Sequence, residues 1–292
     1  MIAVDLGQSG CRIKYGDKLH TTQLAKLAGK PISEALERNF QQISAQSDLV
    51  ALSLTGLYGD VEDVAPFLEI CRNHFGAKEV VVIDDGLANF AGSLLGQSGV
   101  ALTLGGGVVA VGGHQERFSH SDGLGNIFGD EGGGIWLGSA GLTRALATRD
   151  LRDDDQEILE NLSDEVAVFD SLESKNGTEA VSLAIVAARK VLELAESGNR
   201  TAVAIRDLGA LRLSKTVISA WLKVGDISES FKVTVSGGIS QNAAYKKLIF
   251  EKIKEAGASA ELVDIRGDNI DGAIWLAENI KHDIRPMLGW AR

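Results

Sequence analysis

The sequence predicts a mixed α/β fold built from two similar halves, and three observations support this. Short apolar segments rich in Val, Ile and Leu recur without strict polar alternation, as in strands covered on both faces. Helical patterns lie between several of them, which indicates partly parallel sheets. Two stretches, AVDLGQSGCRIKYG and ALTLGGGVVAVGG, share a plan of strand, glycine turn and strand. We therefore expect duplicated α/β domains that face each other across a cleft.

The expected strands cover, in chain order, residues 2–7, 11–16, 49–56, 79–85, 99–106, 108–113, 231–238 and 260–265. The expected helices cover 32–47, 61–75, 87–95, 134–148, 178–197, 199–223, 241–256 and 271–281. From about Leu151 to Val224 the alternation gives way to an Ala-rich helical insertion, with RDDDQE as a solvated loop. The first domain is expected over 1–98, with a C-terminal helix over 276–292 returning to it, and the second over 99–275.

Composition excludes several classes of protein. The net charge of −11 argues against a nucleic-acid groove, although glycine-rich loops can hold nucleotides through backbone amides. The only two cysteines, Cys11 and Cys71, are too few for a disulfide framework or a four-cysteine zinc site. No basic leader precedes the first strand and no apolar run reaches membrane-spanning length, so we expect a cytoplasmic protein without a membrane partner.

Asp5 lies in DLGQS, within an otherwise apolar strand, where a carboxylate is costly unless it is paired or near a metal. It could bond the turn amides from Gly7 to Ser9. Alternatively it could hold Mg²⁺, directly or through water, while Gly7 and Ser9 donate to a phosphate.

Two further glycine turns follow strands. LGGGVVAVGG, residues 104–113, fits a plain hairpin turn or a second phosphate turn with Gly105, Gly106 and Gly107. VSGGISQN, residues 235–242, places Gly237, Gly238 and Asn242 between a strand and a helix, where nucleotides commonly bind in α/β proteins.

Carboxylates mark two helix starts. In VVVIDDGLANFAG, Asp85 could cap the helix or accept a substrate hydroxyl proton. In NIFGDEGGGIWLGS, Asp130 and Glu131 precede three glycines, which fits either a carboxylate cap on a helix from about Gly133 to Ala147 or a ligand site with bare backbone. His114 and His120 lie in a glycine- and serine-rich hairpin and are expected to face solvent.

Taken in order, these motifs resemble the actin, sugar kinase and Hsp70 ATPase superfamily. They are most similar to the BadF/BadG/BcrA/BcrD ATPase family, which includes N-acetylglucosamine kinase. DLGQS resembles its first phosphate motif, LTGLYG the loop after the third strand, DDGLANFAG the connecting motif, and LGGGVVAVG the second phosphate motif. DGLGNIFGDEGGGIWLG, residues 122–138, is close to the kinase signature, while ARKVLELAESGNRTA, VSGGISQN and DGAIWLA are similar to later motifs.

The resemblance implies two RNase H-like domains and an ATP- and Mg²⁺-dependent sugar kinase, with a homodimer left open. It implies that Asp85 is the catalytic base and a sugar contact, and that Asp5 is a metal ligand. The implied ATP contacts are Asp5, Gly7, Ser9, Gly105, Gly106, Gly107, Gly237, Gly238 and Asn242. The implied further sugar contacts are Gly123, Gly125, Asp130 and Glu131.

Two departures from the family pattern bear on the substrate. Gly105-Gly106-Gly107-Val108 lacks the Thr and Ser of the usual Gly-Thr-Gly-Ser turn. The chain reads LAKLAGKPISEAL where amino-sugar kinases carry a Gly-Pro-x-Asn-like loop. The resemblance therefore implies phosphorylation of N-acetylglucosamine or glucosamine, at the 6-hydroxyl, with loose selectivity at the 2-substituent.

Two other functions stay open at this point. The family's other branch activates CoA-dehydratase or reductase partners through a shared iron–sulfur cluster, which needs cysteines near a domain interface. A nonenzymatic nucleotide or sugar sensor would fit the missing hydroxyls of the second phosphate turn.

Overall fold

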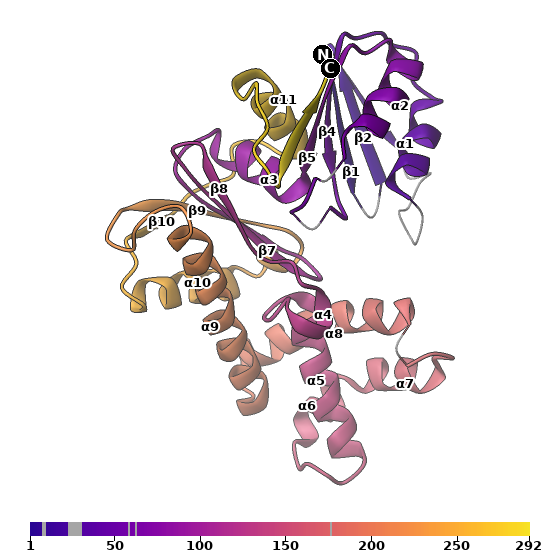
Figure 1. Ribbon diagram of the computed structural model, residues 1–292. Helices are drawn as coiled ribbons and strands as arrows, with labels where there is room; N and C mark the ends of the chain where they lie inside the picture. Colours follow the sequence, from indigo (N-terminus) through magenta and orange to yellow (C-terminus); the bar gives the residue numbers. More distant parts are fainter. Residues whose placement is uncertain (8–9, 23–30, 58, 62, 176) are drawn as a thin grey trace. The chain divides into compact units, whose positions relative to one another are not determined.

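A computed structural model describes residues 1–7, 10–22, 31–57, 59–61, 63–175 and 177–292 (Figure 1). The chain divides into two compact units. Unit 1 comprises Met1–Ala101, Val111–His120 and Val263–Arg292, and unit 2 comprises Leu102–Ala110 and Ser121–Leu262. Ser9 and the predicted loop segment 23–30 lie outside the described residues.

The first sheet has six strands in the order β11-β5-β4-β1-β2-β3. Strands β1, β2 and β3 form an antiparallel meander, β1, β4 and β5 run parallel, and β11 joins β5 antiparallel. The bounds are β1 Ile2–Gly7, β2 Gly10–Tyr15, β3 Lys18–Thr22, β4 Leu49–Leu54, β5 Glu79–Asp84 and β11 Leu288–Ala291.

Helices cover both faces of this sheet (Figure 1). Val80 and Val82 of β5 pack in one core with residues of α1 (Ile32–Phe40) and α2 (Ala65–Phe75). Val81 and Ile83 pack in another core with residues of α3 (Asp85–Leu94) and α11 (Asn269–Asn279). Successive side chains of a strand point to opposite faces, so a continuous apolar run is needed where both faces are covered.

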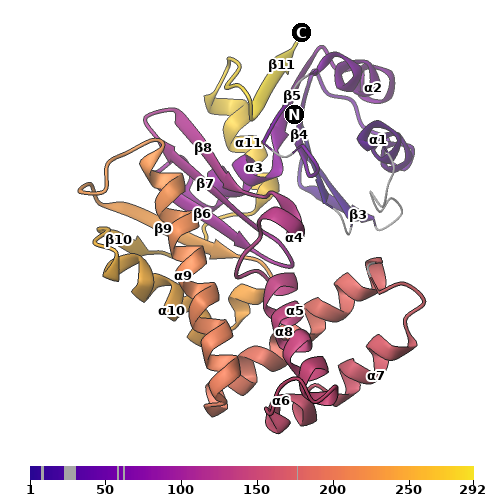
Figure 2. The ribbon, with the colours of Figure 1, turned by 60° about the horizontal axis from the view of Figure 1, so that its bottom comes forward.

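The second sheet has five strands in the order β10-β9-β6-β7-β8 (Figure 2). The bounds are β6 Gly99–Leu104, β7 Val108–His114, β8 Arg117–Asp122, β9 Phe231–Ser236 and β10 Ala260–Leu262. Apart from β11, the strand order of the first sheet is β3-β2-β1-β4-β5, and that of the second is β8-β7-β6-β9-β10. In each sheet, three strands that are consecutive in sequence lie at one edge, and two strands from later in the chain follow them. The predicted duplicated α/β fold is confirmed.

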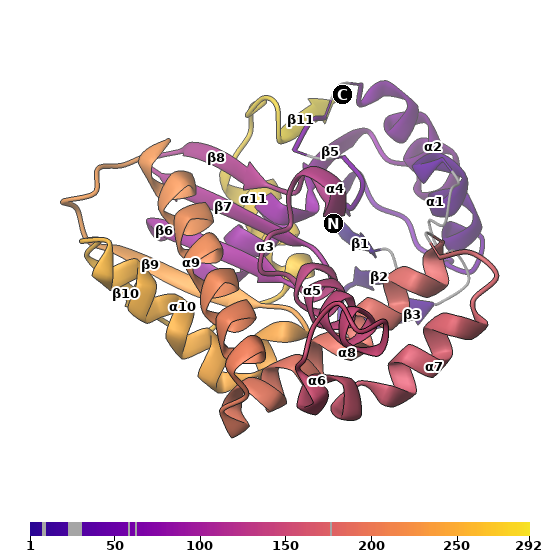
Figure 3. The same cartoon turned by 90° about the horizontal axis from the view of Figure 1, so that it is seen from below.

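The predicted helical region is also confirmed. It contains α6 Gln156–Asn161, α7 Ser163–Ser171, α8 Thr178–Ser197 and α9 Arg200–Leu222. The other helices of unit 2 are α4 Gly125–Phe128, α5 Gly134–Arg149, the 3₁₀ helix η1 Ile239–Gln241 and α10 Ala243–Glu255. Helices α5 and α8 lie side by side (Figure 3). A Cβ on Gly138 would lie 1.7 Å from the Ala184 carbonyl oxygen, so only glycine permits this approach.

Three expectations need correction. The segment 276–292 is not one helix, because α11 ends at Asn279 and the chain finishes as strand β11. The helix expected over 32–47 ends at Phe40. Strands β3 and β8 were not expected, because KLHTT and RFSHSD are too polar to stand out as buried strands. None of the helices in the described part of the chain has the length and apolar composition needed to cross a bilayer.

Candidate functional site

The start of α3 carries two adjacent carboxylates with different environments. Asp84, not Asp85, is the N-cap, because its side chain accepts from the Gly86 amide. Asp85 is the first helical residue, and burial, together with the negative charge of Asp84, raises its pKa to about 7. A side-chain hydrogen bond from Thr55 acts in the opposite direction. A carboxylate with a pKa near neutrality suits proton transfer, since it is basic enough to accept a proton and still ionised at pH 7.

Asp84 also holds the loop after β4. Its Oδ1 accepts from the Gly86 amide at 3.0 Å, and its Oδ2 accepts from the Gly59 amide at 2.8 Å. Gly59 has φ of +74°, and a Cβ there would lie 3.1 Å from the His120 ring. The His120 ring therefore lies against Gly59 and is partly buried, whereas we had expected it to face solvent.

Asp5 is already paired with a cation. Its Oδ2 accepts from Nε and Nη2 of Arg12 at 3.1 and 2.7 Å. Its Oδ1 accepts from Ser53 Oγ at 3.1 Å and from Asn269 Nδ2 at 3.2 Å. These four donors occupy the acceptor positions of the carboxylate, so direct coordination of Mg²⁺ would have to displace at least one of them. The donor set around Asp5 therefore does not fit a directly bound ion, and no three His, Cys, Asp or Glu side chains group as a metal site among the described residues.

The first glycine turn is described only at its ends. Gly7 closes β1 opposite Gly10 of β2, and the expected phosphate donor Ser9 lies outside the described residues.

The second glycine turn is the point on which several segments of unit 2 converge. The amides of Gly134 and Ile135, at the start of α5, donate to the carbonyls of Gly105 and Gly106, each at 2.9 Å. A Cβ on Gly237 would lie 2.5 Å from the Leu104 carbonyl oxygen. The glycines of GDEGGG and VSGG thus let backbone pack on backbone here. They bring the segments of the predicted phosphate, sugar and adenosine motifs together.

Asp130 lies at the same point. It is 7% exposed, adopts φ of +58°, and its Oδ1 accepts from the Val108 amide at 2.9 Å. A Cβ on Gly107 would lie 2.7 Å from its Oδ2, so the carboxylate lies directly against the glycine turn. Burial raises the pKa of Asp130. A left-handed conformation at a non-glycine residue is uncommon and clusters at functional sites.

Neither carboxylate of the GDEG segment caps α5. The N-cap is Gly133, which has no side chain to cap the helix, so the carboxylate cap, one of the two interpretations of this segment, is wrong. Glu131 instead forms an ion pair with Arg212 at 3.5 Å. Gly132 is held by Tyr245, whose hydroxyl donates to its carbonyl at 2.9 Å.

The turn before Asp130 is closed by Asp122 and exposes an apolar tip. The Asp130 amide donates to Asp122 Oδ1 at 2.8 Å, and Gly123 and Gly125 both have positive φ. The large apolar side chains at the tip are largely exposed, namely Leu124, Ile127 and Phe128. Sequence patterning had not singled out this apolar tip.

A cavity of about 420 Å³ lies beside VSGGISQN, the segment predicted to be the adenosine motif. Its lining includes Gly238 and Asn242, with Arg189 and Glu193 from α8. Asn242 also has structural bonds, because its Oδ1 accepts from the Tyr245 amide as the N-cap of α10 and its Nδ2 donates to Glu196. Its side chain is therefore anchored. Arg189 lies in the segment ARKVLELAESGNRTA but had not been singled out, since a helical arginine has no signal in sequence that separates it from a solvated one.

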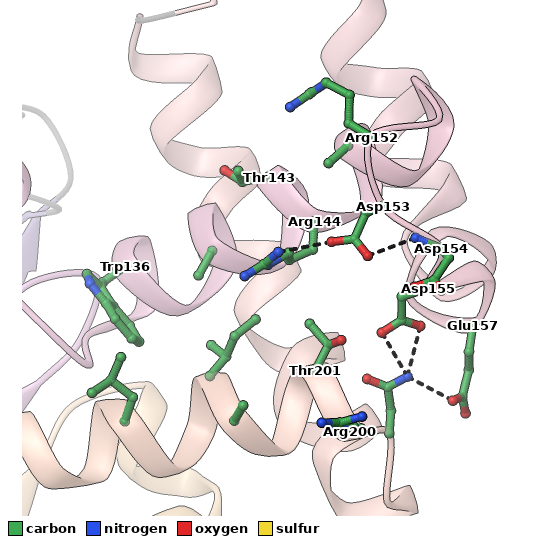
Figure 4. Close-up of a pocket in the computed structure, with 16 residues that line it drawn as sticks. Trp136, Thr143, Arg144, Arg152, Asp153, Asp154, Asp155, Glu157, Arg200 and Thr201 are labelled. Atoms are coloured by element: carbon green, nitrogen blue, oxygen red, sulfur yellow. Dashed lines mark hydrogen bonds and ion pairs between the residues drawn. The ribbon is translucent and has the colours of Figure 1, made fainter.

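A larger cavity of about 1060 Å³ lies between α5 and α9 (Figure 4). Several polar side chains along its wall bond to one another. Arg144 pairs with Asp153 at 2.9 Å, and Asn199 Nδ2 donates to Asp155 and to Glu157. The lining includes the acidic segment that sequence had predicted to be a solvated loop.

The two cysteines are unsuited to holding an iron–sulfur cluster. Cys11 and Cys71 are both buried in the core formed by α1, α2 and the first sheet. Burial raises the pKa of each thiol to about 12, so the thiolate that ligates iron is strongly disfavoured. Cys71 lies on the buried face of α2, with its side chain in the core.

Unit 1 thus contains Asp5, Gly7, Asp84 and Asp85, with Arg12 and Thr55 as partners that sequence reasoning missed. Within unit 2, Gly105–Gly107, Asp130 and Gly237 lie together, with Gly238 and Asn242 on the adjoining cavity.

Several solved structures share this fold, among them proteins named as sugar kinases and a ROK family transcriptional regulator. A Chromobacterium violaceum protein named as a candidate N-acetylglucosamine kinase matches with a TM-score of 0.65 and 22% identity, over 94% of this chain and 98% of that one. A similarly named protein from Porphyromonas gingivalis has a TM-score of 0.62 and 14% identity, over 96% and 99%. A ROK family glucokinase from Streptomyces griseus, in complex with glucose and AMPPNP, has a TM-score of 0.56 and 15% identity, over 95% and 97%.

No curated protein matches the sequence closely enough to be informative. The model of the BadF/BadG/BcrA/BcrD ATPase family, by contrast, matches residues 8–275. That range includes the Asp85 and Asp130 segments and both of the later glycine turns. The chain belongs to the BadF/BadG/BcrA/BcrD ATPase family.

Proposed function

We propose that the protein is an ATP-dependent kinase for a hexose-type amino sugar, N-acetylglucosamine or glucosamine, acting at the 6-hydroxyl. The observation that carries this proposal is Asp85, a carboxylate whose pKa is raised to about 7 at the start of α3. A kinase gains rate from a base that accepts the proton of the sugar hydroxyl, whereas an ATPase that only hydrolyses ATP has no sugar hydroxyl to deprotonate.

In the proposed reaction, the sugar hydroxyl oxygen forms a bond to the γ-phosphorus of ATP while the bond to the bridging oxygen of ADP breaks. The hydroxyl proton passes to a carboxylate oxygen of Asp85. Asp130 would accept from another sugar hydroxyl, in a charge-assisted hydrogen bond. The backbone around Gly105–Gly107 would donate to phosphate oxygens, and the cavity beside Gly238 would receive the adenosine. Most of the rate gain would come from positioning and charge stabilisation.

Magnesium is expected to enter with the nucleotide, since phosphate oxygens are its usual ligands in such sites. Because Asp5 is bonded to Arg12, we derive no step through a metal held by this residue. Its predicted role as a metal ligand stays a prediction.

The test of the proposed function is a comparison of sugars. ADP formation should depend on sugar, and kcat/KM should be highest for N-acetylglucosamine and glucosamine, with glucose lower. The preference for the acetyl sugar over glucosamine should stay below roughly a thousandfold, because apolar contacts alone seldom give more. The measurement is a coupled ADP assay with product analysis for the phosphorylated carbon. Absence of sugar-dependent ADP formation with every hexose would reject the proposal.

The rate should fall in acid with a midpoint set by Asp85. Its pKa is raised, so below about pH 7 it is protonated and cannot accept the hydroxyl proton. We expect kcat/KM to fall about tenfold per pH unit below this value and to level off above it. N-acetylglucosamine is the substrate for this measurement, because its amide does not titrate in this range. A flat profile between pH 5.5 and 8 would remove Asp85 from the role of base.

A further inference from the structure

We propose that Asp84 is a positioning residue, which ties Gly59, after the end of β4, to the start of α3 and so helps to hold Thr55 on the Asp85 carboxylate. This inference rests on the proposed function, in which Asp85 is the base. Asp84 itself would touch neither substrate. It would act through the loop.

The bonds of Asp84 exceed what a helix cap requires. One oxygen suffices to cap α3 through the Gly86 amide, and Oδ1 makes that bond at 3.0 Å. Oδ2 accepts instead from the Gly59 amide at 2.8 Å, across 25 positions of sequence. The residue is 2% exposed. A buried carboxylate is costly unless its oxygens are hydrogen-bonded, so the Gly59 amide is a necessary partner.

The backbone is fixed both at Asp84 and at Thr55. The Asp84 amide donates to the Met287 carbonyl at 2.9 Å, which fixes the backbone at the end of β5. The Thr55 amide donates to the Leu6 carbonyl at 3.0 Å, which joins the start of the loop to β1. Thr55 is therefore held by β1, and Gly59 is held by Asp84. The Thr55 side chain hydrogen-bonds Asp85.

Replacement by asparagine keeps the helix cap and removes the bond to Gly59, together with the negative charge that raises the pKa of Asp85. An asparagine oxygen can still cap α3, since Asn is as good an N-cap as Asp. Its NH₂ group would then meet the Gly59 amide, so that one donor would face another. Asp84→Asn should therefore free the loop while leaving the helix start in place. Asp84→Ser serves the same purpose with a side chain that caps well but is too short to bond Gly59 as well.

The decisive experiment is a double-mutant cycle with Thr55→Val, measured as kcat for the best sugar. We expect each single variant to lower kcat about tenfold or more, with the KM for ATP changed less than twofold. We expect the kcat of the double variant to lie within about threefold of the kcat of the less active single variant. The reason is that both changes remove the same contact with Asp85. Multiplicative losses would overturn the proposal.

The matched control is Asp155→Asn. Asp155 also caps a helix, α6, and also bonds a distant side chain, that of Asn199, but it lies on the large cavity of unit 2. We expect this variant to keep the kcat of the unaltered protein. A comparable loss of kcat in Asp155→Asn would show that the Asp84 effect is a general result of weakening a cap.

A second measurement separates this inference from the proposed function. Hydrogen–deuterium exchange of peptides covering 55–61 should be faster in Asp84→Asn and Asp84→Ser than in the unaltered protein, and unchanged in Asp155→Asn. This outcome does not depend on turnover. If no sugar is phosphorylated but exchange changes as expected, the proposed kinase activity fails while the loop is still tied by Asp84. Unchanged exchange in both Asp84 variants overturns the inference even if the protein is a kinase.

Discussion

Asp85→Asn should lower kcat for sugar phosphorylation by about 10²–10⁴, the usual loss on removal of a general base. The amide cannot accept the hydroxyl proton. Binding of Mg·ATP should be nearly unchanged, because the residues proposed to bind phosphate and adenosine lie in other segments. Rapid-quench or coupled assays give kcat, and calorimetric titration with a nonhydrolysable ATP analogue gives the nucleotide affinity.

The same variant should be more stable than the unaltered protein at neutral and alkaline pH. A carboxylate whose folded pKa is raised contributes stability that is present below its unfolded pKa and is lost as pH rises through the folded value. Here that window runs from 3.8 to about 7. Asp85→Asn should therefore raise the free energy of unfolding at pH 8 by up to about 4 kcal/mol, and do little at pH 3. A lower Tm at pH 8 together with near-normal kcat would reduce Asp85 to a structural residue.

Gly138→Ala should destabilise the protein strongly. The new Cβ would lie 1.7 Å from the Ala184 carbonyl oxygen, so α5 and α8 would have to separate. Overpacking of this kind usually costs about 1–3 kcal/mol, and a backbone obstacle that cannot rotate away places this case at or above the upper end. Chemical denaturation monitored by circular dichroism gives the free energy of unfolding.

Gly238→Ala is the matched control for this measurement. No atom lies within 4 Å of a Cβ at Gly238, and its φ of −65° suits alanine. Without ligand, its stability should stay within about 1 kcal/mol of the unaltered protein. Equal losses from the two changes would mean that close approach of α5 and α8 does not limit stability.

The parts of the fold that could be predicted were those with an unbroken local signal. VVVI in β5 indicated a strand covered on both faces, and the Ala-rich run before Val224 indicated helices. Strands β3, β8 and β11 gave no such signal. In β3 and β8, the sheet accepts polar residues where a face is only partly covered. The C-terminal LGWA segment is a strand because it pairs with β5, a long-range contact that local patterning cannot detect.

The candidate site also contains residues that could be predicted from the sequence and residues that could not. Glycine turns and carboxylates at strand ends could be recognised, because their chemistry is unusual within apolar segments. Which of two adjacent aspartates caps α3 could not be predicted, since both satisfy the same local preference and the choice depends on the Gly59 amide. The partner of Asp5 could not be predicted either, because Arg12 belongs to the neighbouring strand and its neighbours in sequence do not set it apart.

The burial of both cysteines has a practical consequence for spectroscopy. Maleimide dyes react with thiolates, and neither native thiol is exposed or readily ionised. A single cysteine introduced at Leu151, which is 89% exposed, would therefore be the preferred labelling position in an otherwise unaltered chain. Pairs of such positions, one in each unit, would allow distances between the units to be followed by energy transfer as nucleotide and sugar are added, without first removing Cys11 or Cys71.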